Sequence, residues 1–430
     1  MATLAATDMP ARGTSERLLL WTLLIVYILN FLDRQIVTIL AEPIRKDLGL
    51  ADWQLGLLGG FAFAAFYAVL GIPIARHVDK PATNRVTIIT VSLALWSGMT
   101  ALCGLASGFV QLLLCRVGVG VGEAGCTPSA HSLIADSVAA DRRGRAIAFY
   151  GLGIPIGSLL GTIIGGQLAD AFGWRTAFFV VGMPGLLMAL FVWASLRDPR
   201  AARPAPAVAP PPAPSLRAAL AGLAGNRCYV LLVTAAALVA FLSYGKGQWA
   251  LSYFQRTHGL TPGQAGLFVG GILGLAGIAG TWAGGWLGDR FGHRHMVTAP
   301  AIGMAVAAPI LFAGYMTDDW RMAIALLVLP TLLNSMYYGP AYASAQLMVP
   351  RESRAMASAV MLFAQNFIGL GLGPLLFGLL SDAFKPMAGT ESVRWVLLIA
   401  AWAGLLPAFF FWRAGRRMAA AIADNQPAGR

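Results

Sequence analysis

The chain has 430 residues, of which 57% are hydrophobic and only 12% are charged, and its mean hydropathy is +0.68. A soluble globular protein carries about 25% charged residues, so this composition excludes an ordinary soluble enzyme, and the high hydrophobicity excludes a disordered chain. The net charge of +12 would suggest nucleic-acid binding in a soluble protein. In a membrane protein, however, Lys and Arg gather in the cytoplasmic loops, so we expect a polytopic membrane protein with no nucleic-acid partner.

Long apolar stretches, each near the roughly 20 residues that a helix needs to cross a bilayer, recur along the whole chain. They predict an all-α polytopic membrane protein with twelve transmembrane helices, because an outer-membrane barrel would need short alternating strands instead. The first apolar stretch is too long for a cleavable signal peptide and contains Asp33 and Arg34. The predicted spans cover residues 18–42, 53–76, 86–107, 109–137, 144–169, 174–196, 226–255, 262–288, 296–315, 321–349, 354–381 and 393–413.

The charges predict the orientation and the domain organisation. With the N-terminus in the cytoplasm, the cytoplasmic segments hold roughly three times as many Lys and Arg as the opposite segments, so both termini are expected inside the cell. A basic stretch rich in Pro and Ala follows the sixth span and is typical of a semi-extended linker. We therefore predict a cytoplasmic tail over 1–17, six-helix bundles over 18–196 and 226–413, a cytoplasmic linker over 197–225, and a second tail over 414–430.

The two predicted bundles repeat each other in sequence. GLADWQLGL begins at Gly49 and GLTPGQAGL begins at Gly259, and Asp79 and Asp289 are separated by the same 210 residues. Two parallel six-helix repeats, related by an axis along the membrane normal, are the architecture of the major facilitator transporters. In that fold the substrate site lies near the middle of the membrane, between the halves.

Several motifs carry a resemblance to a known family. The major facilitator loop motif GxxxDRxGRR is nearly complete from Gly285 to Arg294, and the first-half counterpart over 75–85 lacks its glycines. The stretches over 30–50, 116–136 and 142–161 resemble the Spinster-like branch of that superfamily, and the resemblance covers essentially the whole chain. It implies a transporter, not an enzyme. Eukaryotic members of the branch are associated with export of sphingolipids and lysophospholipids, and bacterial members look proton-coupled.

Charged residues at the cytoplasmic loops predict a conformational latch. An Asp at a cytoplasmic helix end can face the N-terminus of a neighbouring helix and a loop Arg, in a contact made in one conformation and broken in the other. The alternative is ordinary positive-inside loop charge. The candidate latch residues are Asp79, Lys80, Arg145, Asp289, Arg290 and Arg354.

Charged residues inside the predicted spans are candidates for proton coupling, since each costs at least ~2.5–3.5 kcal/mol to insert. Arg116 and Glu123 lie on one helix but roughly 10 Å apart along its axis. We therefore expect pairs across helices, Asp33 with Arg116 and Glu123 with Arg34. A carboxylate whose cationic partner moves away can take up a proton. The alternative is a fixed ion-pair staple, and His131 either joins the relay or is a packed histidine.

A second set of residues predicts a wet substrate cavity. Lys246 either attracts an anionic head group or extends its amine toward water or a carbonyl. Polar and aromatic residues of the tenth and eleventh spans line a cavity or bind helices together, and residues 334, 338 and 342 share a face by i,i+4 spacing. The candidate cavity residues are Tyr27, Asn30, Phe31, Lys246, Asn334, Tyr338, Tyr342, Gln365 and Asn366.

The predicted function is proton-coupled secondary active transport of amphipathic molecules, such as sphingoid or lysophospholipid-like lipids or lipophilic drugs, by alternating access. The alternatives are a symporter of a small polar metabolite, a channel, or a lipid-modifying membrane enzyme. No Walker, HExxH, GxSxG or paired Cys/His motif occurs, so we expect no cofactor and no metal, and the proton gradient as the energy source. The short loops favour a bacterial inner-membrane protein, and we expect a monomer whose partners are membrane lipids and the substrate.

Overall fold

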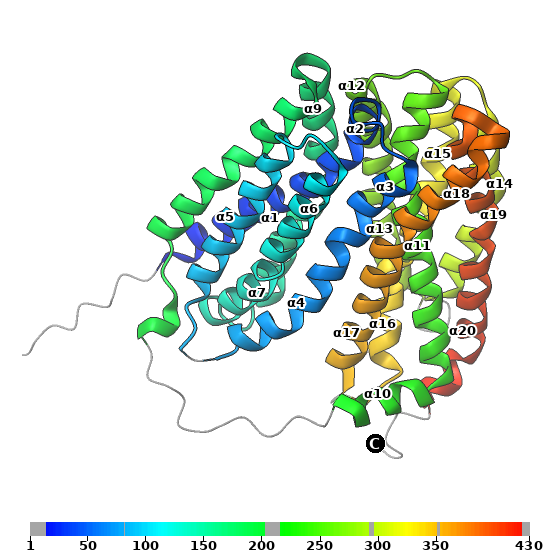
Figure 1. Cartoon of the computed structure of the whole chain (residues 1–430). Helices are drawn as coiled ribbons and strands as arrows, with labels where there is room; N and C mark the ends of the chain where they lie inside the picture. Colours follow the sequence, from blue (N-terminus) through cyan, green and yellow to red (C-terminus); the bar gives the residue numbers. More distant parts are fainter. Residues whose placement is uncertain (1–13, 81, 203–215, 292–295, 351–352, 424–430) are drawn as a thin grey trace, which may run out of the picture.

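The computed structural model of the chain describes residues 14–80, 82–202, 216–291, 296–350 and 353–423, and within these ranges it is helical without any strand (Figure 1). The helices of the first half are α1 (Glu16–Ile39), α2 (Ala41–Leu48), α3 (Asp52–Gly56), η1 (Leu57–Phe61), α4 (Ala62–Val78), α5 (Arg85–Cys103), α6 (Phe109–Glu123), α7 (Cys126–Ser137), α8 (Arg143–Gly151) and α9 (Gly153–Ser195).

The helices of the second half are α11 (Arg227–Thr257), α12 (Pro262–Gln264), η3 (Ala265–Gly271), α13 (Ile272–Phe291), α14 (Thr298–Met316), α15 (Trp320–Ser335), α16 (Tyr338–Leu347), α17 (Arg354–Ala364), η5 (Gln365–Leu372), α18 (Gly373–Ala388), η6 (Gly389–Glu391), α19 (Ser392–Ala403) and α20 (Leu405–Ala423). Of these, η3 and η5, like η1 in the first half, are π-helical segments.

The described chain contains ten segments that are long and apolar enough to cross a membrane. Two of them, Arg143–Ser195 and Met356–Met418, have 53 and 63 residues, whereas one crossing needs roughly 20. Gly173 interrupts the first with a φ of 81° and Gly389 interrupts the second with a φ of 55°, which is left-handed backbone that glycine adopts at little cost. The all-α polytopic fold is therefore confirmed, and the ten segments are consistent with twelve crossings.

Five predicted spans are each interrupted between two α-helices. The breaks separate α1 from α2, α6 from α7, α8 from α9, α15 from α16, and α19 from α20. In each case a proline is the third residue of the helix that follows the break: Pro43, Pro128, Pro155, Pro340 and Pro407. Because proline has no N–H to donate and is tolerated in the first turn of a helix, it fits the start of a new helix better than the interior of a long one.

The two halves interlock at one end of the molecule, which we call the closed end (Figure 1). There α3 of the first half packs on α18, and α12 and η3 of the second half pack on α9. A Cβ on Gly56 would lie 2.3 Å from the Pro374 carbonyl oxygen, and a Cβ on Gly266 would lie 2.2 Å from that of Thr162. Only glycine allows both approaches, so the repeated motif that contains Gly56 and Gly266 has a packing role in each half.

Apolar packing also concentrates at the closed end. The largest buried cluster draws on both halves and includes Ile44, Trp249 and Phe254, whereas two smaller clusters each lie within one half. Toward the other end, which carries α10 (Leu216–Gly225) and α20, the ribbons of the two halves diverge (Figure 1). The two halves are therefore packed together at the closed end, and they lie farther apart toward the end that carries α10 and α20.

The predicted linker is described only at its two ends. A 3-10 turn, η2 (Pro199–Ala202), follows the first half, and α10 precedes the second half. Residues 203–215 and the outer parts of both predicted tails lie outside the described residues. The domain boundaries remain predictions.

Candidate functional site

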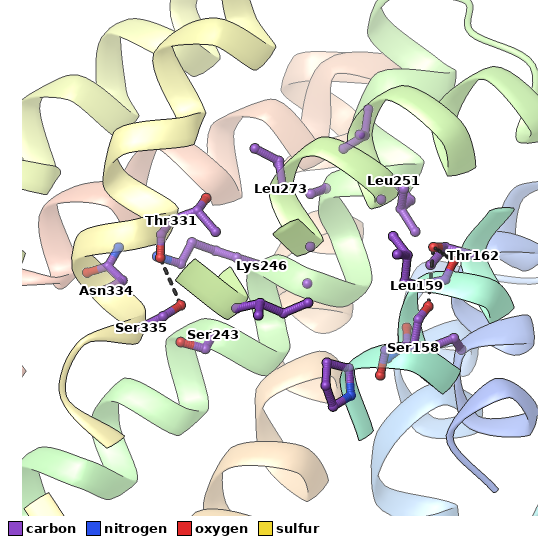
Figure 2. A pocket seen from close by; sticks show the side chains of 18 of the residues that line it. Ser158, Leu159, Thr162, Ser243, Lys246, Leu251, Leu273, Thr331, Asn334 and Ser335 are labelled. Carbon is purple, nitrogen blue, oxygen red and sulfur yellow. Dashed lines mark hydrogen bonds between the residues drawn. The ribbon is translucent and has the colours of Figure 1, made fainter. Parts of the chain in front are cut away.

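Two adjoining cavities lie between the halves. One has a volume of about 320 Å³ and the other about 420 Å³, within the range of about 300–1,000 Å³ that is usual for small-molecule sites. The smaller cavity lies between α9 on one side and α11, η3, α13 and α15 on the other (Figure 2). The residues that line both cavities are Gln35, Ser243, Gly247, Asn334 and Ser335. Because they share these walls, the two cavities lie side by side at the interface between the halves.

Arg34 and Arg116 line the larger cavity from the first half. The guanidinium carbon of Arg34 lies 4.7 Å from the ring centre of Phe31 and 4.5 Å from that of Phe63. Facing them, Tyr244 and Tyr338 line the cavity from the second half. Because aromatic faces attract cations, the rings of Phe31 and Phe63 hold the Arg34 guanidinium at the cavity wall.

Arg34 forms an ion pair with Glu123, as predicted from the helix spacing. Both Nε and Nη2 of Arg34 lie 2.7 Å from the same carboxylate oxygen, Oε2. The other oxygen of Glu123, Oε1, is buried and accepts no hydrogen bond from any described residue. The Glu123 side chain is 0% exposed, whereas Arg34 is 17% exposed and reaches the cavity. The pair therefore has a buried anionic member and a cationic member that faces the cavity.

The second predicted pair, Asp33 with Arg116, does not form in this conformation. No oxygen of Asp33 comes within the 4.0 Å that defines an ion pair with Arg116, although both side chains are 2% exposed and they interact electrostatically. The Nε of Arg116 instead donates to the carbonyl oxygen of Leu58, at 3.3 Å. That oxygen lies in the π-helical segment η1, and this local backbone geometry could not be read from side-chain spacing.

The predicted cavity residues divide into two groups. Phe31 and Tyr338 line the larger cavity, Lys246 lines the smaller one, and Asn334 lines both. The others line neither cavity among the described residues. Three of them have other surroundings: Tyr27 stacks on Tyr150, Asn30 is buried, and Tyr342 donates to Gln365 Oε1 at 2.9 Å. The residues that lie off both cavities are Tyr27, Asn30, Tyr342, Gln365 and Asn366.

His131 lies away from the Arg34–Glu123 pair. Its ring is exposed and makes an edge contact with Tyr150 at 5.5 Å between ring centres, and no hydrogen bond links it to Glu123 within the described chain. In this conformation His131 is thus neither linked to the pair nor packed as a buried, hydrogen-bonded histidine among the described residues, and its part in a relay remains a prediction.

Among the side chains that the structure describes, the predicted latch residues are not joined to one another in this conformation. Asp79 is exposed at the C-terminal end of α4, and Lys80, Arg145 and Arg354 are exposed as well. Arg290 lies over the ring of Trp286, at 5.3 Å. The side chain of Asp289 lies outside the described residues. The latch therefore remains a prediction for a different conformation.

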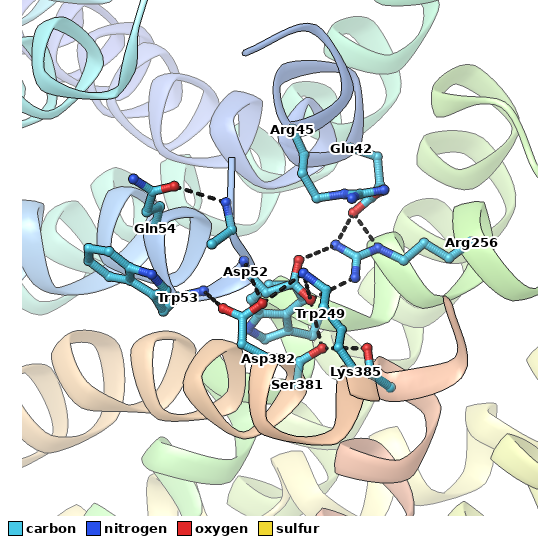
Figure 3. Close-up of polar contacts among 12 residues, drawn as sticks. Glu42, Arg45, Asp52, Trp53, Gln54, Trp249, Arg256, Ser381, Asp382 and Lys385 are labelled. Carbon is cyan, nitrogen blue, oxygen red and sulfur yellow. Dashed lines mark hydrogen bonds and ion pairs between the residues drawn. The ribbon is translucent and has the colours of Figure 1, made fainter. Parts of the chain in front are cut away.

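A charged cluster at the closed end was not predicted as a functional unit (Figure 3). Arg256 of α11 binds Asp52 through Nη1 and Nη2 at 2.8 and 2.7 Å, and it binds Glu42 through Nε at 2.7 Å. Ser381 donates to Asp52 at 2.7 Å, and Lys385 Nζ lies 3.4 Å from it. Glu42 and Asp52 belong to the first half and the other three to the second, so this cluster ties the halves together.

A second cluster, also missed, surrounds Arg85 at the other end of the first half. Arg85 is 0% exposed and pairs with Asp198 at 2.5 Å and with Asp136 at 2.6 Å. Arg200 also binds Asp136, at 3.0 Å. Burial raises the pKa of Asp198, but the hydrogen bonds from Arg85 outweigh it and leave that pKa below its usual value. The cluster anchors the start of the linker to α5 and α7.

Comparison with known proteins gives consistent matches. The Major Facilitator Superfamily model matches residues 23–284 and 249–428. An MFS-type efflux pump of Mycolicibacterium smegmatis is 32% identical over 92% of this chain and 91% of its own length. Protein spinster homolog 1 of Homo sapiens is 28% identical over 89% of this chain and 77% of its own length.

Among solved structures, a bacterial homolog to the human lysosomal transporter Spinster, in an inward-facing and unoccupied conformation, superposes with a TM-score of 0.84. It is 30% identical and covers 96% of this chain and 99% of that one. A D-xylose-proton symporter superposes with a TM-score of 0.72 at 17% identity, which shows a shared fold.

Proposed function

Since the chain belongs to the Major Facilitator Superfamily and is similar to its Spinster-like members, we propose that it is a proton-coupled carrier of amphipathic molecules that works by alternating access. The relatives are named as transporters or efflux pumps, and the chain has many apolar helices, so it is an integral membrane transporter and not an enzyme.

The closed end supports alternating access. The contacts between the halves there are polar as well as apolar, and each is made by side chains of opposite halves that meet only while this end is shut. Access to the cavities is then from the end that carries α10 and α20. With both termini in the cytoplasm of a bacterial cell, this conformation faces inward, and its counterpart opens the closed end to the outside.

The single observation that carries proton coupling is the free oxygen of Glu123. A buried carboxylate oxygen without a hydrogen-bond donor is costly, and protonation lowers this cost because it removes the buried negative charge. Protonation also removes the charge that holds Arg34, which lines the cavity. Uptake of a proton at Glu123 therefore changes the charge of the cavity wall, and Asp33 and Arg116 lie close enough to share in this response.

The cavity walls support an amphipathic cargo. The smaller cavity combines an ammonium, hydroxyl and amide groups with a wall of aliphatic side chains that includes Leu159, Leu251 and Leu273. Ile278 adds to this apolar wall from α13. An aliphatic wall of this kind favours a cargo with a hydrocarbon part over a small polar metabolite. We propose that the protein acts as a monomer in the bacterial inner membrane.

Reconstituted liposomes test the proposal. A fluorescent lysophospholipid is the probe, and its uptake is compared with and without an imposed pH gradient. We expect the gradient to accelerate uptake in the parent protein, and Asp33→Asn and Glu123→Gln to abolish this acceleration. Gradient-driven uptake that is unchanged in both variants would refute proton coupling at this cluster.

Two controls separate coupling from folding. Glu16→Gln removes a carboxylate that pairs with Arg142 at the surface, at 2.9 Å with the two side chains 32% and 50% exposed, and it should leave driven uptake unchanged. Exchange of labelled for unlabelled probe at equal pH needs no net proton movement, so it should persist in Glu123→Gln. Loss of both exchange and driven uptake would indicate that the variant no longer works as a carrier at all. Thermal unfolding then shows whether the variant is misfolded or is folded but inactive.

A further inference from the structure

The charged residues described as lining the two cavities are all of one sign. Arg34 and Arg116 line the larger cavity and Lys246 lines the smaller one, and no Asp or Glu is among the described residues that line either. The cations differ in how they are compensated. Arg34 is neutralised by Glu123, and Arg116 donates to the Leu58 carbonyl oxygen with Asp33 nearby.

Lys246 has no such compensation. It is half-buried on α11, and no described residue forms a hydrogen bond or an ion pair with it. Figure 2 shows its side chain directed toward α15, where Thr331 and Asn334 line the same cavity. A partly buried ammonium without an anion is unfavourable. An anionic ligand in this cavity would therefore gain more from Lys246 than from either arginine.

Neutral polar groups surround the Lys246 end of the cavity. Ser243 lies one helical turn before Lys246, and Asn334 and Ser335 face it from α15 (Figure 2). Hydroxyl and amide groups donate hydrogen bonds to carboxylate and phosphate oxygens without adding charge. The ammonium and these donors together form the kind of setting that fixes the orientation of an anionic head group.

The opposite part of the same cavity is mainly apolar. Leu159 projects from α9, Leu251 from α11 and Leu273 from α13, and Figure 2 shows them grouped away from Asn334 and Ser335. Ser158 and Thr162 lie beside Leu159, and the Thr162 hydroxyl already donates to the carbonyl oxygens of Ser158 and Leu159. The cavity thus has one cationic, hydrogen-bonding end and one largely aliphatic end, against which hydrocarbon can be buried.

We infer that Lys246 binds the anionic head of the cargo, a phosphate or a carboxylate, while the hydrocarbon part of the cargo lies along Leu159, Leu251 and Leu273. The inference rests on the proposed carrier function and adds the sign of the head group and the residue that selects it. It disfavours lipophilic cations as cargo, because the uncompensated ammonium of Lys246 in the smaller cavity would repel them.

Calorimetric binding to the full chain in nanodiscs of zwitterionic lipid tests this assignment, with empty nanodiscs subtracted. The probes are octyl phosphate, octanoate, octyltrimethylammonium and inorganic phosphate. We expect the parent to bind octyl phosphate, octanoate or both, and Lys246→Gln to weaken that binding by at least about tenfold. Lys246→Arg keeps the charge and should stay within about threefold of the parent. Comparison of octyl phosphate with octanoate identifies which head group the site prefers.

The matched control is Lys46→Gln, which removes an exposed lysine of α2 far from the cavities and should not change binding. Three results would overturn the inference: equal anion binding by Lys246→Gln and the parent, tighter binding of octyltrimethylammonium than of either anion, or inorganic phosphate binding as tightly as octyl phosphate. Thermal unfolding detects a misfolded Lys246→Gln protein. In that case the test is the comparison of anion binding with octyltrimethylammonium binding in the parent and in Lys246→Arg.

The binding experiment tests the head-group site independently of the proposed carrier function, since it uses no pH gradient. Anion binding that depends on Lys246 without gradient-driven uptake would contradict the carrier proposal and leave the head-group site standing. Gradient-driven uptake that does not depend on Lys246 would contradict the head-group site alone.

Discussion

Replacement of Arg256 by methionine should open the closed end. Arg256 joins the second half to two carboxylates of the first half, and the exposed fractions of the three side chains are 5% for Arg256, 2% for Glu42 and 0% for Asp52. Methionine keeps much of the apolar length of the side chain and removes its charge. Two buried carboxylates of the first half then lose their main cationic partner from the second half.

The magnitude follows from what remains around Asp52. Removal of one member of a buried ion pair costs about 3–5 kcal/mol when nothing replaces it. Ser381 still donates to Asp52 at 2.7 Å, and Lys385 Nζ stays 3.4 Å away, so part of the interaction survives. We therefore expect a loss of about 2–3 kcal/mol from this conformation, which is about a 30- to 150-fold shift of the equilibrium toward the state open at this end.

Electron–electron double resonance can measure this shift. Spin labels at the exposed positions Lys46 of α2 and Met387 of α18 report the separation of the halves at the closed end, in a background without the four native cysteines. We expect a longer-distance population to grow in Arg256→Met. Arg45→Gln is the matched control, because Arg45 binds Glu42 within its own helix at 3.1 Å and does not bridge the halves. An unchanged distance distribution in a folded Arg256→Met protein would refute the reasoning.

Two further predictions concern stability, measured as thermal unfolding in detergent. Asp198 has a lowered pKa, so its pairing with Arg85 stabilises the fold above the unfolded-state pKa of about 3.9 and is lost as the pH falls through the folded-state pKa. Asp198→Asn should therefore lower the unfolding temperature at neutral pH, and the difference in unfolding temperature between variant and parent should become smaller in acid. A difference in unfolding temperature that does not depend on pH would contradict this. Gly280→Ala should cost about 1–3 kcal/mol, because its Cβ would lie 2.1 Å from the Leu332 carbonyl oxygen, whereas Gly285→Ala meets nothing within 4 Å; equal losses would contradict the packing argument.

Much of the fold could be predicted from composition and repeats. Apolar stretches of membrane-spanning length and the repeated motif at Gly49 and Gly259 were enough to predict a helical membrane protein with two related halves. The ion pair between Arg34 and Glu123 was also predictable, because helix geometry separates Arg116 from Glu123 and leaves partners on another helix.

The cavity was predicted only in part, for a physical reason. The i,i+4 argument placed residues 334, 338 and 342 on one face of a continuous helix. The chain breaks at Met336 and Tyr337, between α15 and α16, and Tyr342 turns to Gln365 while Asn334 and Tyr338 face the cavity. A helical periodicity does not extend across such a break.

The charged cluster at the closed end could not be predicted from sequence spacing. Glu42, Asp52 and Arg256 lie near span ends, where charges are common and usually solvated, and more than 200 residues separate Arg256 from Asp52. Only the docking of α3 against α18 and α11 brings them together. The repeated motif around Asp52 was the one feature of the sequence that pointed to this region. It indicated a packing site but did not identify the residues that pack there.

The central claim is that the buried Arg34–Glu123 pair takes up and releases the proton that drives transport. Infrared difference spectroscopy of the reconstituted protein, recorded between alkaline and acidic buffer, measures this most directly. The account predicts a carbonyl band of a protonated carboxylic acid that appears in acid in the parent, is missing in Glu123→Gln and persists in the Glu16→Gln control. The same band in Glu123→Gln, or a Glu123 that stays ionised over the whole pH range in which the gradient drives uptake, would contradict the account.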